Sequence, residues 1–137
     1  MGLVYAEIEL SNPRRPELRS VDQRALVDTG STFLMVPEHV AIQLGLESLE
    51  DREITLADGG KTKKPYVGPV EVRAFGRRAF VGAIVAGDET LLGAIPMEDM
   101  DLVVHPERRW VGPNPLSPNI PSGKAKSIRD EGGDDDA

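Results

Sequence analysis

Apolar and polar residues alternate along several short stretches of the chain, which is the pattern of half-buried β-strands. In residues 3–10 the even-numbered positions are apolar, whereas Glu7 and Glu9 are charged. Residues 70–74 alternate in the same way, and the apolar run 79–85 has the composition of a buried partner strand. The pattern therefore predicts a fold built from hairpins of β-strands.

Two segments break this alternation and predict short helices. The first runs from Pro37 to Leu44, with a proline in its first turn and Gly45 as the terminating residue. The second runs from Ala94 to Met100, again with a proline in the first turn. The other expected parts are a loop at 11–16, strands at 19–27 and 33–36, a solvated acidic stretch at 47–53, and closing strands at 102–104 and 110–111.

A further hairpin is predicted between residues 54 and 66. Ile54 to Leu56 and Lys61 to Tyr66 have strand composition, and the pair Asp58-Gly59 between them favours a tight turn. We interpret Asp58 as a turn residue and not as a catalytic acid. The basic run 61–64 is interpreted as a solvated face, and attraction for acidic substrates is the alternative.

Length and composition fit one domain of mostly β structure. The chain has 137 residues with 14 glycines, 11 prolines and only 4% aromatic residues, which is typical of short strands joined by many turns. We expect the domain to occupy residues 1–112. Apolar residues become sparse after that, so residues 113–137, which end in an acidic run, are expected to form a disordered tail.

Charge and residue content exclude several classes of function. There is no cysteine, so thiol nucleophiles, disulfides and zinc-thiolate sites are excluded. His39 and His105 have no partner at metal-ligand spacing, and we expect no metal and no cofactor. The net charge of −7 argues against nucleic acid as a partner, and Arg77-Arg78 and Arg108-Arg109 are interpreted as turn charges.

No apolar run approaches the roughly 20 residues of a membrane helix. The longest uncharged apolar-rich run is 79–87. We therefore expect a soluble, cytoplasmic protein without a membrane partner.

The most informative stretch of the chain is Ala25-Leu26-Val27-Asp28-Thr29-Gly30-Ser31. It leads a buried strand directly into an acid, and Gly30 allows a sharp turn that would hold the Asp28 carboxylate at the floor of a cleft. An ordinary turn or N-cap acid is the alternative. The stretch resembles the Asp-Thr-Gly active-site loop of aspartic proteases of the retropepsin-like, single-lobe kind found in retroviruses, bacteria and archaea.

A second segment extends this resemblance over residues 3–111. Leu91-Leu92-Gly93 precedes a helix, as the Asp28 stretch does, and in this family such a segment packs beside the Asp-Thr-Gly loop. The hairpin between the two copies corresponds to the family's flap, with its tip at Ala57, Asp58, Gly59 and Gly60. The resemblance implies a closed β-barrel lobe with a flap hairpin and one or two short helices. Two features depart from the viral pattern: Ala94 replaces an arginine, and the flap tip lacks a bulky apolar residue.

The resemblance implies peptide hydrolysis, which needs one carboxylate as a base and a second, protonated one as an acid. The sequence holds a single Asp-Thr-Gly, so we expect the second carboxylate to come from Asp28 of another copy in a homodimer. Thr29 is expected to bond across that dimer, and Gly30 and Ser31 are expected to support the loop. The expected partner is a peptide or protein substrate. A peptide-binding or dimerisation module that keeps the fold without hydrolysis is the alternative.

Overall fold

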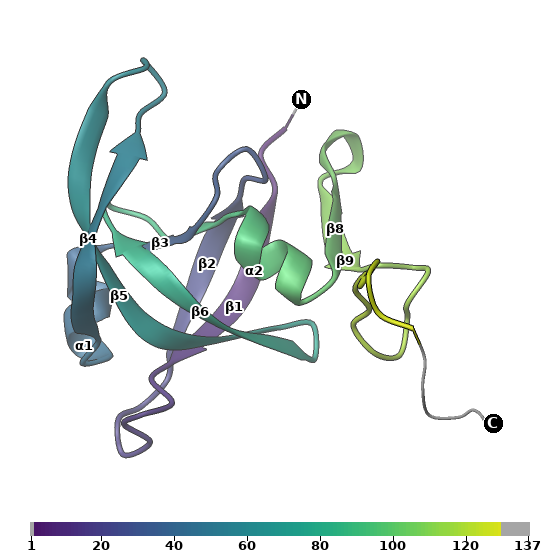
Figure 1. Cartoon of the computed structure of the whole chain (residues 1–137), viewed down its shortest axis with the longest axis horizontal. Coiled ribbons are helices and arrows are strands. Elements are labelled where there is room, and N and C mark those ends of the chain that lie inside the picture. The colour runs from purple at the N-terminus through teal and green to yellow at the C-terminus, as the bar shows by residue number, and fades with distance from the viewer. Residues whose placement is uncertain (1, 130–137) are drawn as a thin grey trace.

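The computed structural model describes residues 2–129, and strands hold 46% of the residues against 12% in helices (Figure 1). The chain is thus mostly β, as the alternation predicted. The strands are β1 Tyr5–Ser11, β2 Val21–Val27, β3 Leu34–Val36, β4 Glu47–Thr55, β5 Lys61–Ala74, β6 Arg77–Val85, β7 Leu91–Leu92, β8 Leu102–His105 and β9 Trp110–Pro113. The helices are α1 Glu38–Gln43, α2 Ala94–Asp99 and the 3-10 turn η1 Pro106–Arg108.

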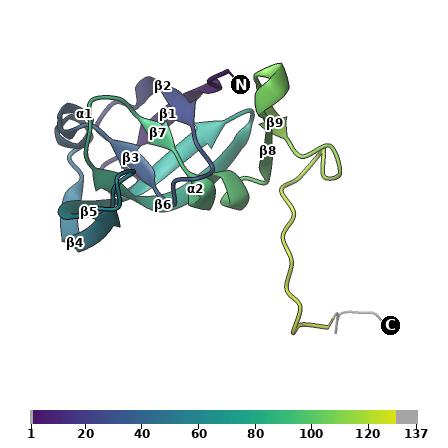
Figure 2. The ribbon, with the colours of Figure 1, turned by 90° about the horizontal axis from the view of Figure 1, so that it is seen from above.

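Six strands close into a barrel (Figure 2). The strand order is β1-β2-β7-β3-β6-β5, and β5 pairs back onto β1 through Glu9↔Arg73 and Leu10↔Val72. β4 continues the sheet beyond β5 as its last strand. Closing the ring removes most free strand edges, so most backbone N–H and C=O groups of these strands form hydrogen bonds with a neighbouring strand.

Side chains from both halves of the chain fill the barrel. The apolar positions of the predicted alternation, such as Ile8, Leu10, Val70 and Val72, are buried. The helix α1 contributes the buried side chains of Val40 and Ala41 to this core. The core therefore lies directly behind the strands that carry the Asp28 stretch.

The strand predictions hold in position but not always in length. β4 begins at Glu47, so the acidic stretch that was expected only to be solvated is exposed yet belongs to a nine-residue strand. β5 runs without a break from Lys61 to Ala74 through Pro65 and the Gly68-Pro69 pair. Pairing with β5 overrides the low strand preference of the acidic residues, because strand formation depends on neighbours more than on intrinsic propensity.

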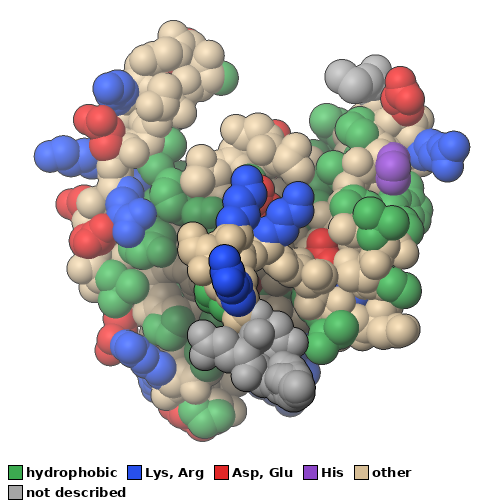
Figure 3. Space-filling model, turned by 45° about the vertical axis from the view of Figure 1, so that its right-hand side comes forward, with side chains coloured by type: hydrophobic (Ala, Val, Ile, Leu, Met, Phe, Trp, Pro, Cys, Tyr) green, Lys and Arg blue, Asp and Glu red, His purple; other side chains and the backbone are tan. Residues whose placement is uncertain are grey.

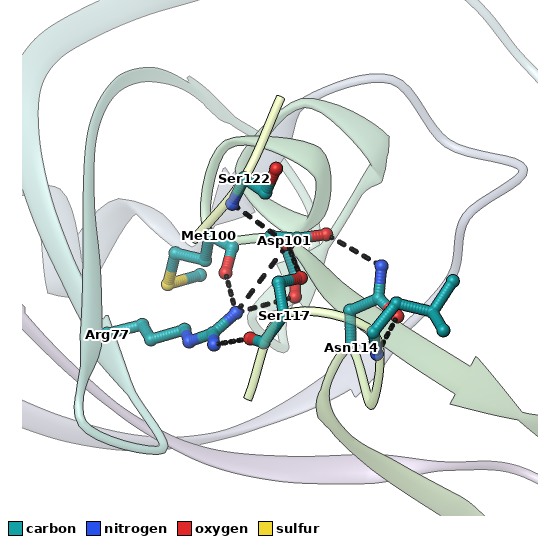
Figure 4. A network of polar contacts seen from close by, with 7 residues as sticks. Arg77, Met100, Asp101, Asn114, Ser117 and Ser122 are labelled. Atoms are coloured by element: carbon teal, nitrogen blue, oxygen red, sulfur yellow. Dashed lines mark hydrogen bonds and ion pairs between the residues drawn. The ribbon is translucent and has the colours of Figure 1, made fainter. Parts of the chain in front are cut away.

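Residues after β9 begin in contact with the domain (Figure 4). Asp101, which follows α2 with a left-handed φ of 53°, accepts hydrogen bonds from Asn114 Nδ2 (3.1 Å), the Ser117 hydroxyl and the Ser122 N–H (2.9 Å). The first part of the stretch 113–137, for which the sequence predicts disorder, is thus tied to the domain. The terminal acidic run lies outside the described residues.

The interpretation of Arg77 as a turn charge is wrong. Its side chain is only 6% exposed, so it is not a surface turn charge. The guanidinium donates to the carbonyl oxygens of Met100 (3.2 Å), Asp101 (2.9 Å) and Ser117. A buried cation is tolerated because these acceptors replace its water. Arg77 thereby joins the start of β6 to the α2–β8 junction and to the segment after β9.

The Asp101 network predicts a pH-dependent stability. The Ser117 hydroxyl, then the Ser122 N–H and the Asn114 amide, hold the pKa of Asp101 below its ordinary value. A lowered folded pKa adds stability that is complete above the ordinary carboxyl pKa of about 3.9 and is lost as pH falls through the folded value. Asp101→Asn should therefore lower Tm at pH 7, and the gap to wild type should shrink at pH values below that ordinary pKa. Thermal melts across pH check this.

The matched control for that experiment is Asp88→Asn, because Asp88 is an exposed turn residue. It should show no gap in Tm at either pH. A gap for Asp101→Asn that stays constant with pH would contradict the assigned carboxylate role.

Candidate active site

The Asp28 carboxylate is held by the loop that it opens. The Gly30 N–H donates to Asp28 Oδ1 at 3.0 Å and the Ser31 hydroxyl donates to Oδ2 at 3.2 Å. The Ser31 N–H closes the turn onto the Asp28 carbonyl oxygen at 3.1 Å. Asp28 and Ser31 are half-buried, whereas Thr29 and Gly30 are exposed. Both carboxylate oxygens are thus oriented, and the loop presents them at the surface.

The second glycine segment packs directly beside this loop, as the resemblance implied. Val27 pairs in parallel with Leu92, and the Asp28 N–H donates to the Leu92 carbonyl oxygen at 3.0 Å. A Cβ on Gly93 would lie 2.3 Å from the Phe33 carbonyl oxygen and 2.7 Å from that of Ser31. Only glycine permits so close an approach of two backbones.

α2 also begins against the Asp28 loop. The Ala94 N–H donates to the Ser31 carbonyl oxygen at 2.7 Å, and the Ile95 N–H donates to that of Thr32 at 2.9 Å. Ala94, the position where the viral pattern has an arginine, therefore contributes its backbone to the loop's support.

A cleft of about 550 Å³ lies between the Asp28 loop and the β4–β5 hairpin. Its lining comes from residues 30–33 and Met35 on one side and from residues 53–57 of β4 and the hairpin tip on the other. Figure 3 shows the surface hollowed between this arm, at upper left, and the middle of the molecule. Residues of the hairpin thus form one wall of the cleft, and the residues that follow Asp28 form the other.

The tip of this hairpin is a loop over residues 56–60. The Leu56 N–H donates to the Gly60 carbonyl oxygen at 2.7 Å, and the Gly60 N–H donates to Asp58 Oδ1 at 2.8 Å. Gly59 has a φ of 87°, which favours glycine. Asp58 is thus a turn residue, as expected from the sequence.

A second cavity of about 300 Å³ borders Asp28 and Thr29. Leu3 and Val4 from the N-terminal segment and Val104 from β8 are among its apolar lining residues. Among residues 2–129, Asp28 is the one charged residue that borders it. The acid therefore adjoins an apolar surface in addition to the loop that leads into the cleft.

An aromatic and cationic stack at the base of the flap was not predicted from the sequence. The Tyr66 ring meets the Phe33 ring edge-on at 6.0 Å, and the Arg52 guanidinium lies 4.0 Å from the Tyr66 ring centroid. A Cβ on Gly82 would lie 2.2 Å from the Tyr66 hydroxyl, so the ring rests on that glycine. Alternation along a strand places residues 52 and 54 on one face and residues 62, 64 and 66 on one face. That alternation was the only sequence signal that could have indicated such a stack.

The described residues offer no cluster for a metal ion. Within residues 2–129, no group of three or more His, Cys, Asp or Glu side chains has the arrangement to hold one. His105 packs against the Trp110 ring, with ring centroids 5.2 Å apart. In that same part of the chain, the helices are too short or too polar to cross a membrane.

A scan against protein-family models gives no match for this chain, and a search of curated proteins gives none either.

The flap is expected to be the most mobile ordered part of the chain. Its two arms pair only with each other over residues 51–65, and the tip has few buried contacts. Amide hydrogen exchange should therefore be much faster at residues 54–62 than at residues 79–85 of β6. Equal protection in the two segments would contradict a flap role for this hairpin.

Proposed function

We propose that this chain is a retropepsin-like aspartic endopeptidase whose catalytic residue is Asp28. The observation that carries the proposal is the Asp28 carboxylate, oriented by the Gly30 N–H and the Ser31 hydroxyl, at the start of a loop that lines a flap-covered cleft. Such a cleft accommodates an extended peptide, and a fixed carboxylate beside it is positioned to activate water.

The reaction requires two carboxylates that share a proton. The unprotonated one takes a proton from water as water attacks the peptide carbonyl carbon, and the protonated one donates a hydrogen bond to the carbonyl oxygen. Ser31 and Gly30 act as positioning residues, because their hydrogen bonds fix the orientation of the Asp28 carboxylate. One Asp28 supplies only half of this pair.

The second carboxylate is proposed to be Asp28 of another copy of the chain. The exposed Thr29 and the apolar cavity beside Asp28 supply a face on which a second Asp28 loop can approach. A two-fold axis brings identical groups together without any further residue.

The experiment that tests the proposal is digestion of a denatured protein mixture at mildly acid pH. Cleavage that a pepstatin-like transition-state mimic inhibits supports it. Saturable peptide binding without any cleavage would instead support the non-catalytic peptide-binding module.

Dilution is expected to abolish activity if two chains build the site. Specific activity should fall once the protein concentration drops below the dimer dissociation constant, because mass action removes the complete site. Sedimentation and activity measured at the same concentrations check this. Full specific activity in a monomeric sample would require a second catalytic acid within one chain.

A further inference from the structure

The β4–β5 hairpin projects from the barrel as an arm (Figure 1). Among the described residues, its two strands pair only with each other over residues 51–65. β5 gains β6 as a second partner at Tyr66, which lies opposite Ile84. The arm therefore leaves the barrel at Tyr66. An isolated two-stranded hairpin is marginally stable, so the contacts made at this point decide how the arm is held.

The Tyr66 ring is contacted by residues from three other segments. It meets the ring of Phe33, the residue before β3, edge-on with 6.0 Å between centroids, and the Arg52 guanidinium of β4 lies 4.0 Å from its centroid. On β6, a Cβ added to Gly82 would lie 2.1 Å from the Tyr66 ring carbon Cζ, so the ring occupies the space of the missing side chain. Aromatic pairs and cation–π contacts of this kind stabilise beyond the area that they bury.

This ring joins the two walls of the cleft. Phe33 lines the cleft, and its wall is fixed, because the Phe33 carbonyl oxygen lies against the backbone of Gly93. On the other wall Ile54 lines the cleft, two residues from Arg52 and on the same face of β4. Among the described residues the cleft lining does not include Tyr66 itself. Tyr66 thus connects the walls from behind the lining.

We propose that Tyr66 is a positioning residue for the cleft. Its ring holds the base of the hairpin against the wall formed by Phe33, and thereby sets how tightly the cleft binds an extended peptide. The inference rests on the proposed function and adds to it a residue that acts through Phe33 and Arg52. When the hairpin swings away, the cleft loses one wall, so the apparent dissociation constant rises as the fraction of molecules with the hairpin in place falls.

Peptide binding to Tyr66→Leu in the Asp28→Asn background tests this inference without hydrolysis. The probes are a library of short labelled peptides with a central pair of apolar residues. Leucine keeps apolar bulk but removes both aromatic contacts, so Kd should rise about fivefold. Tyr66→Phe keeps the ring and should bind as tightly as the parent.

Kinetics of the chain with an intact Asp28 separate positioning from chemistry. Tyr66→Leu should raise KM by a factor similar to the rise in Kd and should leave kcat unchanged. The reason is that a bound peptide contacts both walls and itself holds the hairpin in place.

The other tyrosine of the chain supplies a matched control. Tyr5 is half-buried on β1, as Tyr66 is on β5, and the Arg24 guanidinium lies 3.9 Å from its ring centroid. Tyr5 is not among the residues that line the cleft in the described part of the chain. Tyr5→Leu therefore makes the same change in a similar setting, and it should leave Kd and KM unchanged even where it lowers Tm.

Spin labels measure the position of the hairpin without any peptide. Because the chain has no cysteine, Lys61→Cys and Asp88→Cys place one label on the exposed hairpin and one on the exposed turn after β6. The distribution of distances between the labels should be wider in Tyr66→Leu than in the parent. It should be unchanged in Tyr66→Phe and in Tyr5→Leu. Gly82→Ala, which displaces the ring from the side of β6, should also widen it.

Unchanged label distances or an unchanged Kd in Tyr66→Leu would overturn the inference, as would a rise in Kd that Tyr5→Leu matches or a loss confined to kcat. Failure of Asp28→Asn to bind any probe would overturn it too. These results are separable from the proposed function. A wild-type chain that binds the probes but cleaves none would contradict the endopeptidase, whereas Kd and the label distances would still decide the role of Tyr66.

Discussion

Asp28→Asn is expected to lower kcat/KM by roughly 10²- to 10⁴-fold, because it removes the group that exchanges a proton with water. The fold should survive. The asparagine oxygen can still accept from the Gly30 N–H, and its amide can donate to the Ser31 hydroxyl, so both bonds of the loop have a replacement. Peptide cleavage assays and thermal melts on the same samples check the two parts of this expectation.

The chain offers a matched control for that substitution. Asp58 is also followed two residues later by a glycine whose N–H donates to its Oδ1, at 2.8 Å. Asp58→Asn therefore makes the same chemical change in the same local motif, at the flap tip. Its activity should stay within about twofold of wild type, since surface changes of this kind have small effects. A comparable loss of activity in both variants would mean that Asp28 is a turn residue and not a catalytic one.

Gly93→Ala is expected to have the largest effect on stability. The new Cβ would lie 2.3 Å from the Phe33 carbonyl oxygen and 2.7 Å from that of Ser31, and both are backbone atoms of the Asp28 loop. The loop cannot shift without breaking its bonds to α2. The cost should be at least about 3 kcal/mol, at the top of the range for overpacking, which lowers Tm by roughly 10 °C.

Alanine substitutions at two other glycines provide a comparison for the stability loss expected of Gly93→Ala. At Gly82 the three atoms nearest the added Cβ all belong to the Tyr66 side chain, which can rotate away, so Gly82→Ala should cost less than Gly93→Ala. At Gly123 nothing lies within 4 Å, and Gly123→Ala should leave Tm unchanged. A Tm for Gly93→Ala equal to that of wild type would mean that the loop is not fixed by its neighbours.

Patterns within short stretches predicted the elements of this fold well. The alternation at residues 3–10, the prolines and glycines around the two helices, and the Asp58-Gly59 turn are all local signals, and each element forms where it was expected. The sequence did not predict that the acidic residues 47–53 belong to a strand, because they form one only by pairing with β5.

Contacts between distant residues were beyond such patterns. Arg77 reaches Ser117, which is 40 residues away, and Asp101 holds a segment that composition alone marked as a tail. The Tyr66 stack likewise depends on Gly82 and Phe33, which lie on other elements. In the candidate site, the Asp28 loop could be predicted because its residues are contiguous, whereas the cleft depends on how the β4–β5 hairpin is placed against that loop.

The closed ring of strands leaves a long free strand edge on β4. β4 is the last strand of the large sheet and pairs only with β5 among the described residues, so its outer edge keeps free backbone donors and acceptors. That edge borders the cleft, and a strand edge open to a peptide is also open to another molecule of the same protein. The dense charges of residues 47–53 limit such pairing because two copies would bring like charges together. The same acidic stretch that weakens β4 as a strand therefore protects the protein from aggregation.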